Sequence, residues 1–96
     1  MLKGGVFMVY IISYDLNKPN QKYNQLRELI KNLSNTNYVH VLESTYIIKS
    51  PKSAKEIYEY LASALDNNDG LFISEITQNH YGQLKSEDWP TVRSLF

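Results

Sequence analysis

The strongest constraint on the fold is an apolar segment near the start of the chain, residues 8–15, which ends in Tyr14 and Asp15. The segment is rich in Val, Ile and Tyr, and it is apolar on both faces until Ser13. A strand with one wet face would instead alternate between apolar and polar residues, so this pattern predicts a central strand covered by helices. The turn-forming residues 16–20 follow directly. Asp15 therefore stands where the chain leaves the predicted sheet.

The rest of the chain supplies two helices and further strands. Apolar residues at helical spacing predict a helix over residues 19–33. The β-branched and aromatic stretch 38–49 fits two short strands or one long bent strand equally well. Ser53 and Glu56 form a capping box, which predicts the start of a second helix. Residues 71–76 predict a last core strand.

This order of elements predicts an α+β fold. Split βαβ units with right-handed crossovers give a ferredoxin-like βαββαβ domain, which has an antiparallel sheet with both helices on one face. We expect residues 8–96 to form this single domain and residues 1–7 to form a flexible N-terminal extension.

The C-terminal tail bears on the other face of the sheet. Residues 80–85 fit a short edge strand, and Trp89, Val92 and Phe96 are expected to anchor a final turn of helix. The tail is interpreted as too short to build another layer, so this sheet face is expected to be bare and apolar. A second copy of the chain is the simplest cover, which predicts a homodimer formed through that face.

Composition limits the partners of the protein. Ten basic and ten acidic residues give a formal net charge of zero, so no overall field attracts nucleic acid or an anionic membrane. Nucleic-acid binding, if present, is expected to be weak. Cysteine is absent, which removes thiolate metal sites and cysteine nucleophiles. No segment is long and apolar enough for a membrane span, and we expect a cytoplasmic protein.

Asp15 is the first candidate for chemistry. A carboxylate at the end of a strand is held by a rigid element and still reaches solvent and a metal. The alternative is that Asp15 only caps a loop through hydrogen bonds to the backbone. The two histidines, His40 and His80, lie on different predicted elements, which favours surface or hydrogen-bonded groups over a metal pair. Residues 66–70 are interpreted as a helix-ending turn, because the spacing and the closing Glu of a calcium loop are missing.

Only a few basic side chains are predicted to contact nucleic acid. The candidates for phosphate contact are Lys49, Lys52, Lys55 and Arg27. The lysines cluster before and within the second predicted helix, where a solvated helix start is the competing interpretation.

The chain resembles the CRISPR-associated second Cas family (Cas2-like). The resemblance rests on Tyr14-Asp15 at the end of the first strand, on the βαββαβ order, and on residues 41–47 in the middle strand. It implies a homodimer in which two copies of Asp15 face each other and bind one Mg²⁺. The chain departs from the family in lacking a strongly basic first helix, which suggests a stand-alone branch. Virulence-associated protein D, a ribonuclease toxin, is similar in fold and is the alternative relative.

Three functions remain open at this level. The first is a Mg²⁺-dependent endonuclease acting on RNA or DNA, with Asp15 as catalytic residue and metal ligand. The second is a noncatalytic dimeric scaffold that binds protein or nucleic acid. The third is a small-molecule sensor with its ligand site at the dimer interface.

Overall fold

The computed structural model describes residues 6–17 and 19–96. The helices and strands predicted between residues 8 and 76 are present, and the tail forms two short helices. The elements are β1 (Met8–Asp15), α1 (Pro19–Ser34), β2 (Tyr38–Leu42), β3 (Thr45–Ser50), α2 (Ala54–Ala62), β4 (Gly70–Ile76), η2 (Ser86–Asp88) and α3 (Trp89–Ser94).

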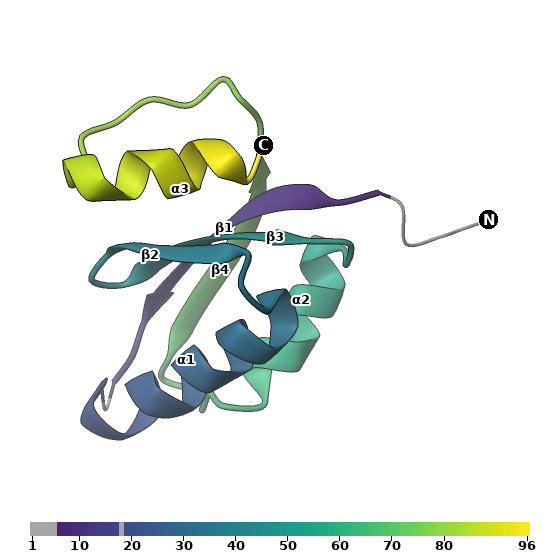
Figure 1. Cartoon of the computed structure of the whole chain (residues 1–96). Coiled ribbons are helices and arrows are strands. Elements are labelled where there is room, and N and C mark those ends of the chain that lie inside the picture. Colours follow the sequence, from purple (N-terminus) through teal and green to yellow (C-terminus); the bar gives the residue numbers. More distant parts are fainter. Residues whose placement is uncertain (1–5, 18) are drawn as a thin grey trace.

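The four strands form one antiparallel sheet in the order β2-β3-β1-β4. β1 is central, as its apolar sequence predicts, while β2 and β4 are the edges. Figure 1 shows α1 and α2 together on one face of the sheet. This arrangement confirms the predicted ferredoxin-like α+β fold. Between α1, α2 and the sheet lies a core that includes the fully buried Ile12, Ile30 and Leu61.

The aromatic stretch after α1 forms two strands rather than one bent strand. β2 and β3 pair as a hairpin, with His40 opposite Tyr46 and Leu42 opposite Thr45. The register shifts between His40 and Leu42. Such an irregularity accommodates an extra residue and re-aims the neighbouring side chains.

The capping box at the start of α2 is formed as the sequence predicted. The Ser53 backbone N–H donates to Glu56 Oε1 at 2.8 Å, and the Glu56 N–H donates to Ser53 Oγ at 3.1 Å. Both groups would otherwise be unpaired donors at the helix start. The hydrogen bonds from the Ser53 backbone and side chain hold the pKa of the Glu56 carboxyl below its ordinary value.

We expect Ser53→Ala to lower the free energy of unfolding by about 1 kcal/mol near neutral pH. Because the folded-state pKa of Glu56 is depressed, the contribution of its carboxylate is present above the ordinary Glu pKa and is lost as the pH falls through the folded value. Ala keeps the backbone N–H that binds Glu56 Oε1, so the variant loses only the part of this contribution that comes from the Ser53 hydroxyl. The difference between variant and wild type should therefore shrink only slightly in acid. Chemical denaturation near neutral pH and at a pH below the ordinary pKa of Glu measures this difference. Ser86→Ala, at an exposed position, is the control. An equal loss from Ser86→Ala would contradict the capping role.

The second face of the sheet is not bare, and here the sequence-based expectation is wrong. Figure 1 shows α3 lying across this face, on the side opposite to α1 and α2. Val92 and Leu95 are buried there, and Trp89 and Phe96 pack against the same cluster. The tail is long enough because the extended segment 77–85 first passes from one edge of the sheet to the other. α3 then returns across the same face of the sheet (Figure 1). The sheet residues that it covers are Val9, Val39, Val41 and Ile47.

Two further expectations concern the tail and the N-terminus. Residues 77–85 adopt no regular strand, so the predicted edge strand at 80–85 is absent from the described chain. Residues 1–5 of the expected extension lie outside the described residues. Val6 and Phe7 are exposed, and Lys49 Nζ lies 5.9 Å from the centre of the Phe7 ring. Among the helices that the structure describes, none combines the length and apolarity needed to cross a membrane.

Candidate functional site

The predicted metal ligand, Asp15, lies at the carboxyl end of β1 with its side chain exposed. Its neighbour on β4 is Gly70, which has no side chain to shield the carboxylate. Within the described ranges 6–17 and 19–96, no hydrogen bond or ion pair occupies this carboxylate. A central strand thus presents an open carboxylate, which suits a hard divalent cation.

The loop beside Asp15 carries two other carboxylates, and both hold the loop together. Asp69 accepts hydrogen bonds from the backbone N–H groups of Asn17 at 2.7 Å and Asp66 at 3.0 Å. Asp66 accepts one from the N–H of Asn68 at 3.0 Å. These contacts agree with the predicted turn. In the part of the chain that the structure describes, no three His, Asp or Glu side chains form a metal-binding group.

One large apolar side chain lies exposed beside Asp15. Phe72 is 69% exposed and pairs with Ser13 across β1 and β4. Ser13 and Asp15 are two residues apart on β1, so both project from the same face as Phe72. α3 lies on this face too, but it packs at the Val9 end of β1. The Asp15 end of the face therefore combines an open carboxylate with an exposed aromatic ring.

The predicted nucleic-acid-binding lysines lie at the opposite end of the sheet. Lys49 pairs with Val9 near the start of β1, and Lys52 and Lys55 follow β3. A strand rises about 3.3 Å per residue, which places the Lys49 backbone roughly 20 Å from that of Asp15. The structure therefore does not bring these lysines to the candidate metal ligand. Arg27, the fourth predicted cation, lies on α1 and contacts a different group of residues.

That group, here called the His40 cluster, consists of His40, Tyr46, Arg27 and Tyr38. The imidazole of His40 lies parallel to the Tyr46 ring, with 4.2 Å between centroids and 2° between planes. Arg27 Nε donates a hydrogen bond to Tyr46 Oη at 3.2 Å. The Tyr38 ring lies 6.2 Å from that of Tyr46. Since Tyr46 is buried and His40 is exposed, the outer face of the imidazole meets solvent.

Hydrogen bonds fix the His40 ring and tie it to the end of β1. The Glu43 carbonyl oxygen lies 3.0 Å from His40 Nε2 and 3.3 Å from Tyr14 Oη. Because a carbonyl can only accept, Nε2 carries the proton of this hydrogen bond. Burial raises the pKa of Tyr14, and the nearby Tyr46 and Tyr23 raise it further. Tyr14 therefore stays protonated and anchors the strand end that carries Asp15.

No sequence motif indicates the His40 cluster, because its members come from β2, β3 and α1. With a turn at Glu43 and Ser44, a regular antiparallel register would put His40 opposite Ile47. The register shift between His40 and Leu42 brings His40 opposite Tyr46 instead, and no local signal predicts that shift. The interpretation of His40 as an isolated surface or hydrogen-bonded group is correct about its exposure and hydrogen bond, but it misses the stack with Tyr46.

With this geometry established, comparison with known proteins assigns a family. The family model described as CRISPR associated protein Cas2 matches residues 8–84. The chain belongs to the Cas2 family. A hypothetical protein from Thermus thermophilus has a crystal structure similar to this fold, with a TM-score of 0.62 and 16% sequence identity. The similarity covers 82% of this chain and 95% of that chain. No curated protein matches the chain.

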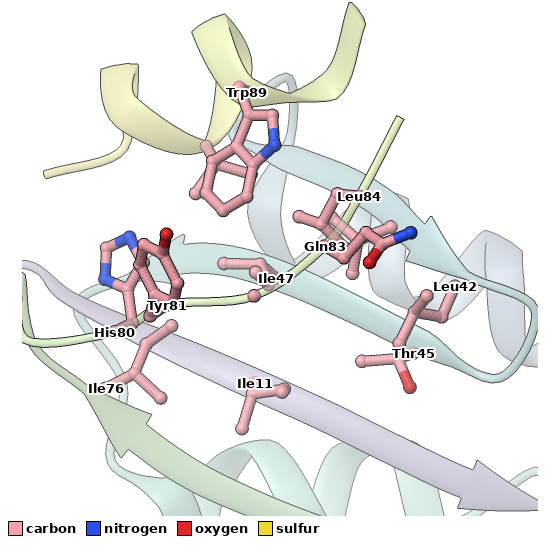
Figure 2. Close-up of a pocket in the computed structure, with 13 residues that line it drawn as sticks. Ile11, Leu42, Thr45, Ile47, Ile76, His80, Tyr81, Gln83, Leu84 and Trp89 are labelled. Carbon is pink, nitrogen blue, oxygen red and sulfur yellow. The ribbon is translucent and has the colours of Figure 1, made fainter. Parts of the chain in front are cut away.

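The Cas2 match includes Asp15 and the His40 cluster but ends before the C-terminal helices. Those helices close over the sheet and leave a cavity of about 250 Å³. Figure 2 shows Ile11, Ile47 and Ile76 of the sheet on one side of this cavity and Trp89 of α3 on another, and residues of the segment from His80 to Leu84 complete the lining. The lining is largely apolar. The residues that close the cavity thus lie partly outside the portion of the chain that defines the family.

Proposed function

We propose that this Cas2-family protein is a homodimeric, Mg²⁺-dependent nuclease that hydrolyses phosphodiester bonds in RNA or DNA. The observation that carries the proposal is the open carboxylate of Asp15 at the end of the central strand. The family match over residues 8–84 supports it.

The proposal requires two copies of the chain. At the end of β1 one protomer supplies the Asp15 carboxylate, and no three His, Asp or Glu side chains of the described residues form a metal-binding group, while Mg²⁺ in proteins is commonly held by one or two carboxylates together with water and substrate phosphates. Two Asp15 side chains facing each other provide that set. The exposed Phe72 on the same face gives a second copy an apolar surface to cover.

In this proposal the residues of the chain have simple roles. Both Asp15 carboxylates hold the cation, and Tyr14 keeps the strand end in place through its hydrogen bond to the Glu43 carbonyl. A bound Mg²⁺ supplies an activated water and neutralises charge on the phosphate.

Cleavage assays with purified protein test the proposal. Labelled single-stranded RNA and duplex DNA are incubated with Mg²⁺, with Mn²⁺ and with EDTA, and light scattering gives the mass in solution. We expect cleavage that needs the metal, from a protein of dimeric mass. A monomer would contradict the proposal. A dimer without cleavage would favour the noncatalytic scaffold, and a small ligand bound between the two copies would favour the sensor.

We also expect weak binding to duplex DNA. The net charge is zero, and the cations Lys49, Lys52 and Lys55 lie far from Asp15, so few phosphates can be neutralised at once. Each phosphate contact changes log K by about 0.9 per unit of log salt, and nonspecific binding is typically micromolar or weaker at physiological salt. Titration of labelled duplex at low and physiological salt should give about micromolar affinity and a shallow slope. Nanomolar binding at physiological salt would contradict this prediction.

A further inference from the structure

The His40 cluster combines a flat aromatic surface with an unpaired cation. The inner face of the His40 imidazole rests on Tyr46, and its outer face is open. Arg27 Nε donates its hydrogen bond to the neutral hydroxyl group of Tyr46. Among the residues that the structure describes, no carboxylate pairs with Arg27. A half-buried guanidinium without an acidic partner attracts an anion, and Arg is well shaped to bind phosphate oxygens.

A groove of about 630 Å³ runs beside the cluster along the edge strand β2. Residues of β2 and its turn, from His40 to Glu43, form one wall, and the segment from Gln83 to Lys85 forms the other. Of the His40 cluster, only His40 lines this groove, and a second cation, Lys85, lies on the other wall. Its volume lies in the range of small-molecule and cofactor sites.

From this arrangement we propose that the His40 cluster is a binding site for a nucleotide with an unpaired base. The base stacks on the open face of His40, and its phosphate is bound by Arg27, with Lys85 available for a neighbouring phosphate. Unpaired bases commonly stack on Tyr, Phe and His rings, and this stacking tolerates any base. In a duplex the base faces are covered, so a paired base cannot use the site.

This site is separate from Asp15 and does not depend on the proposed nuclease activity. Tyr46 pairs with Ile12, which faces the helix-covered core, whereas Asp15 projects from the other face of the sheet. A single strand bound at the edge of β2 is held without metal. The two proposals can therefore fail independently of each other.

The test is binding of a short labelled single-stranded RNA in EDTA, followed by fluorescence anisotropy. We expect His40→Ala to weaken binding at least about fivefold, because stacking on one aromatic side chain has an effect of this size. His40→Phe should keep most of the affinity, and Arg27→Gln should lower it. His80→Ala and Arg93→Gln are matched controls, since His80 also stacks on a ring, that of Phe96, and Arg93 is exposed on α3.

A second measurement guards against variants that fold poorly. The chain has only two histidines, so their ring resonances are easily separated by NMR. The His40 resonances of the wild type should shift as RNA is added, and those of His80 should not. Competition by AMP would show that free nucleotides share the site, whereas competition by single strands alone would show that a strand is needed. Equal loss in His40→Ala and His80→Ala, unchanged affinity in His40→Ala, or a shift confined to His80 would overturn the proposal.

Discussion

Asp15→Asn is expected to reduce metal-dependent cleavage at least roughly a hundredfold, while folding and self-association survive. The amide keeps the size of the side chain but removes the negative charge that a hard divalent cation requires. The exposed position of Asp15 and its lack of partners among the described residues mean that little packing is lost. Initial rates in saturating Mg²⁺ measure the effect. Circular dichroism and light scattering on the same samples show whether fold and mass are kept.

Asp88→Asn is the matched control for this prediction. Asp88 precedes α3 and makes no capping hydrogen bond through its side chain, so the same chemical change should leave the rate unaltered. Cleavage retained in Asp15→Asn would place the reaction elsewhere. Equal losses in both variants would point to a general effect of charge rather than to a metal ligand.

Much of the fold was predictable because its signals are local. The apolar run ending at Asp15 has the composition of a central strand, and the structure places it between β3 and β4. The capping box at Ser53 and Glu56 fixes the start of α2. Right-handed crossovers and short connections then leave few topologies for this order of elements. The choice between two strands and one bent strand over 38–49 depended on a turn at Glu43 and Ser44 that the sequence marks only weakly.

The layer formed by α3 was not predictable in the same way. Val92 and Leu95 indicate an apolar helix face. The local sequence does not determine whether that face packs on the sheet of the same chain or on the sheet of a second copy. Both arrangements bury the same kind of surface. The decision depends on how the extended segment 77–85 crosses the sheet, which is a long-range property of the chain.

The candidate site shows the same division between local and long-range information. Asp15 was found because strand ends can be read from the sequence. The lysines were grouped by closeness along the chain, yet the register puts Lys49 opposite Val9 and away from Asp15. The sequence indicates only a surface or hydrogen-bonded role for His40, because its partners Tyr46 and Arg27 come from other elements. Sites assembled across strands become visible only when the register is known.

The docking of α3 on its own sheet leads to the second large expected effect, that of Val92→Asp. Val92 is 0% exposed and sits among apolar side chains from β1, β2 and β3. A carboxylate cannot be ionised there without a partner, so the variant must either protonate the group or release the helix. Because α3 is the last helix of the described chain, releasing it from the sheet should cost less free energy than keeping the carboxylate buried. We expect the free energy of unfolding to fall by roughly 3 kcal/mol.

Chemical denaturation measures this loss, and binding of an apolar fluorescent dye reports the uncovered sheet face. Ser94→Asp adds the same charge at an exposed position of α3 and should change the stability by less than about 0.5 kcal/mol. The uncovered residues Val9, Val39 and Ile47 would then form an apolar patch of the kind that drives association between copies. Greater mass in light scattering for Val92→Asp than for Ser94→Asp is therefore expected. Wild-type stability and no dye binding in Val92→Asp would show that α3 does not cover this face in solution.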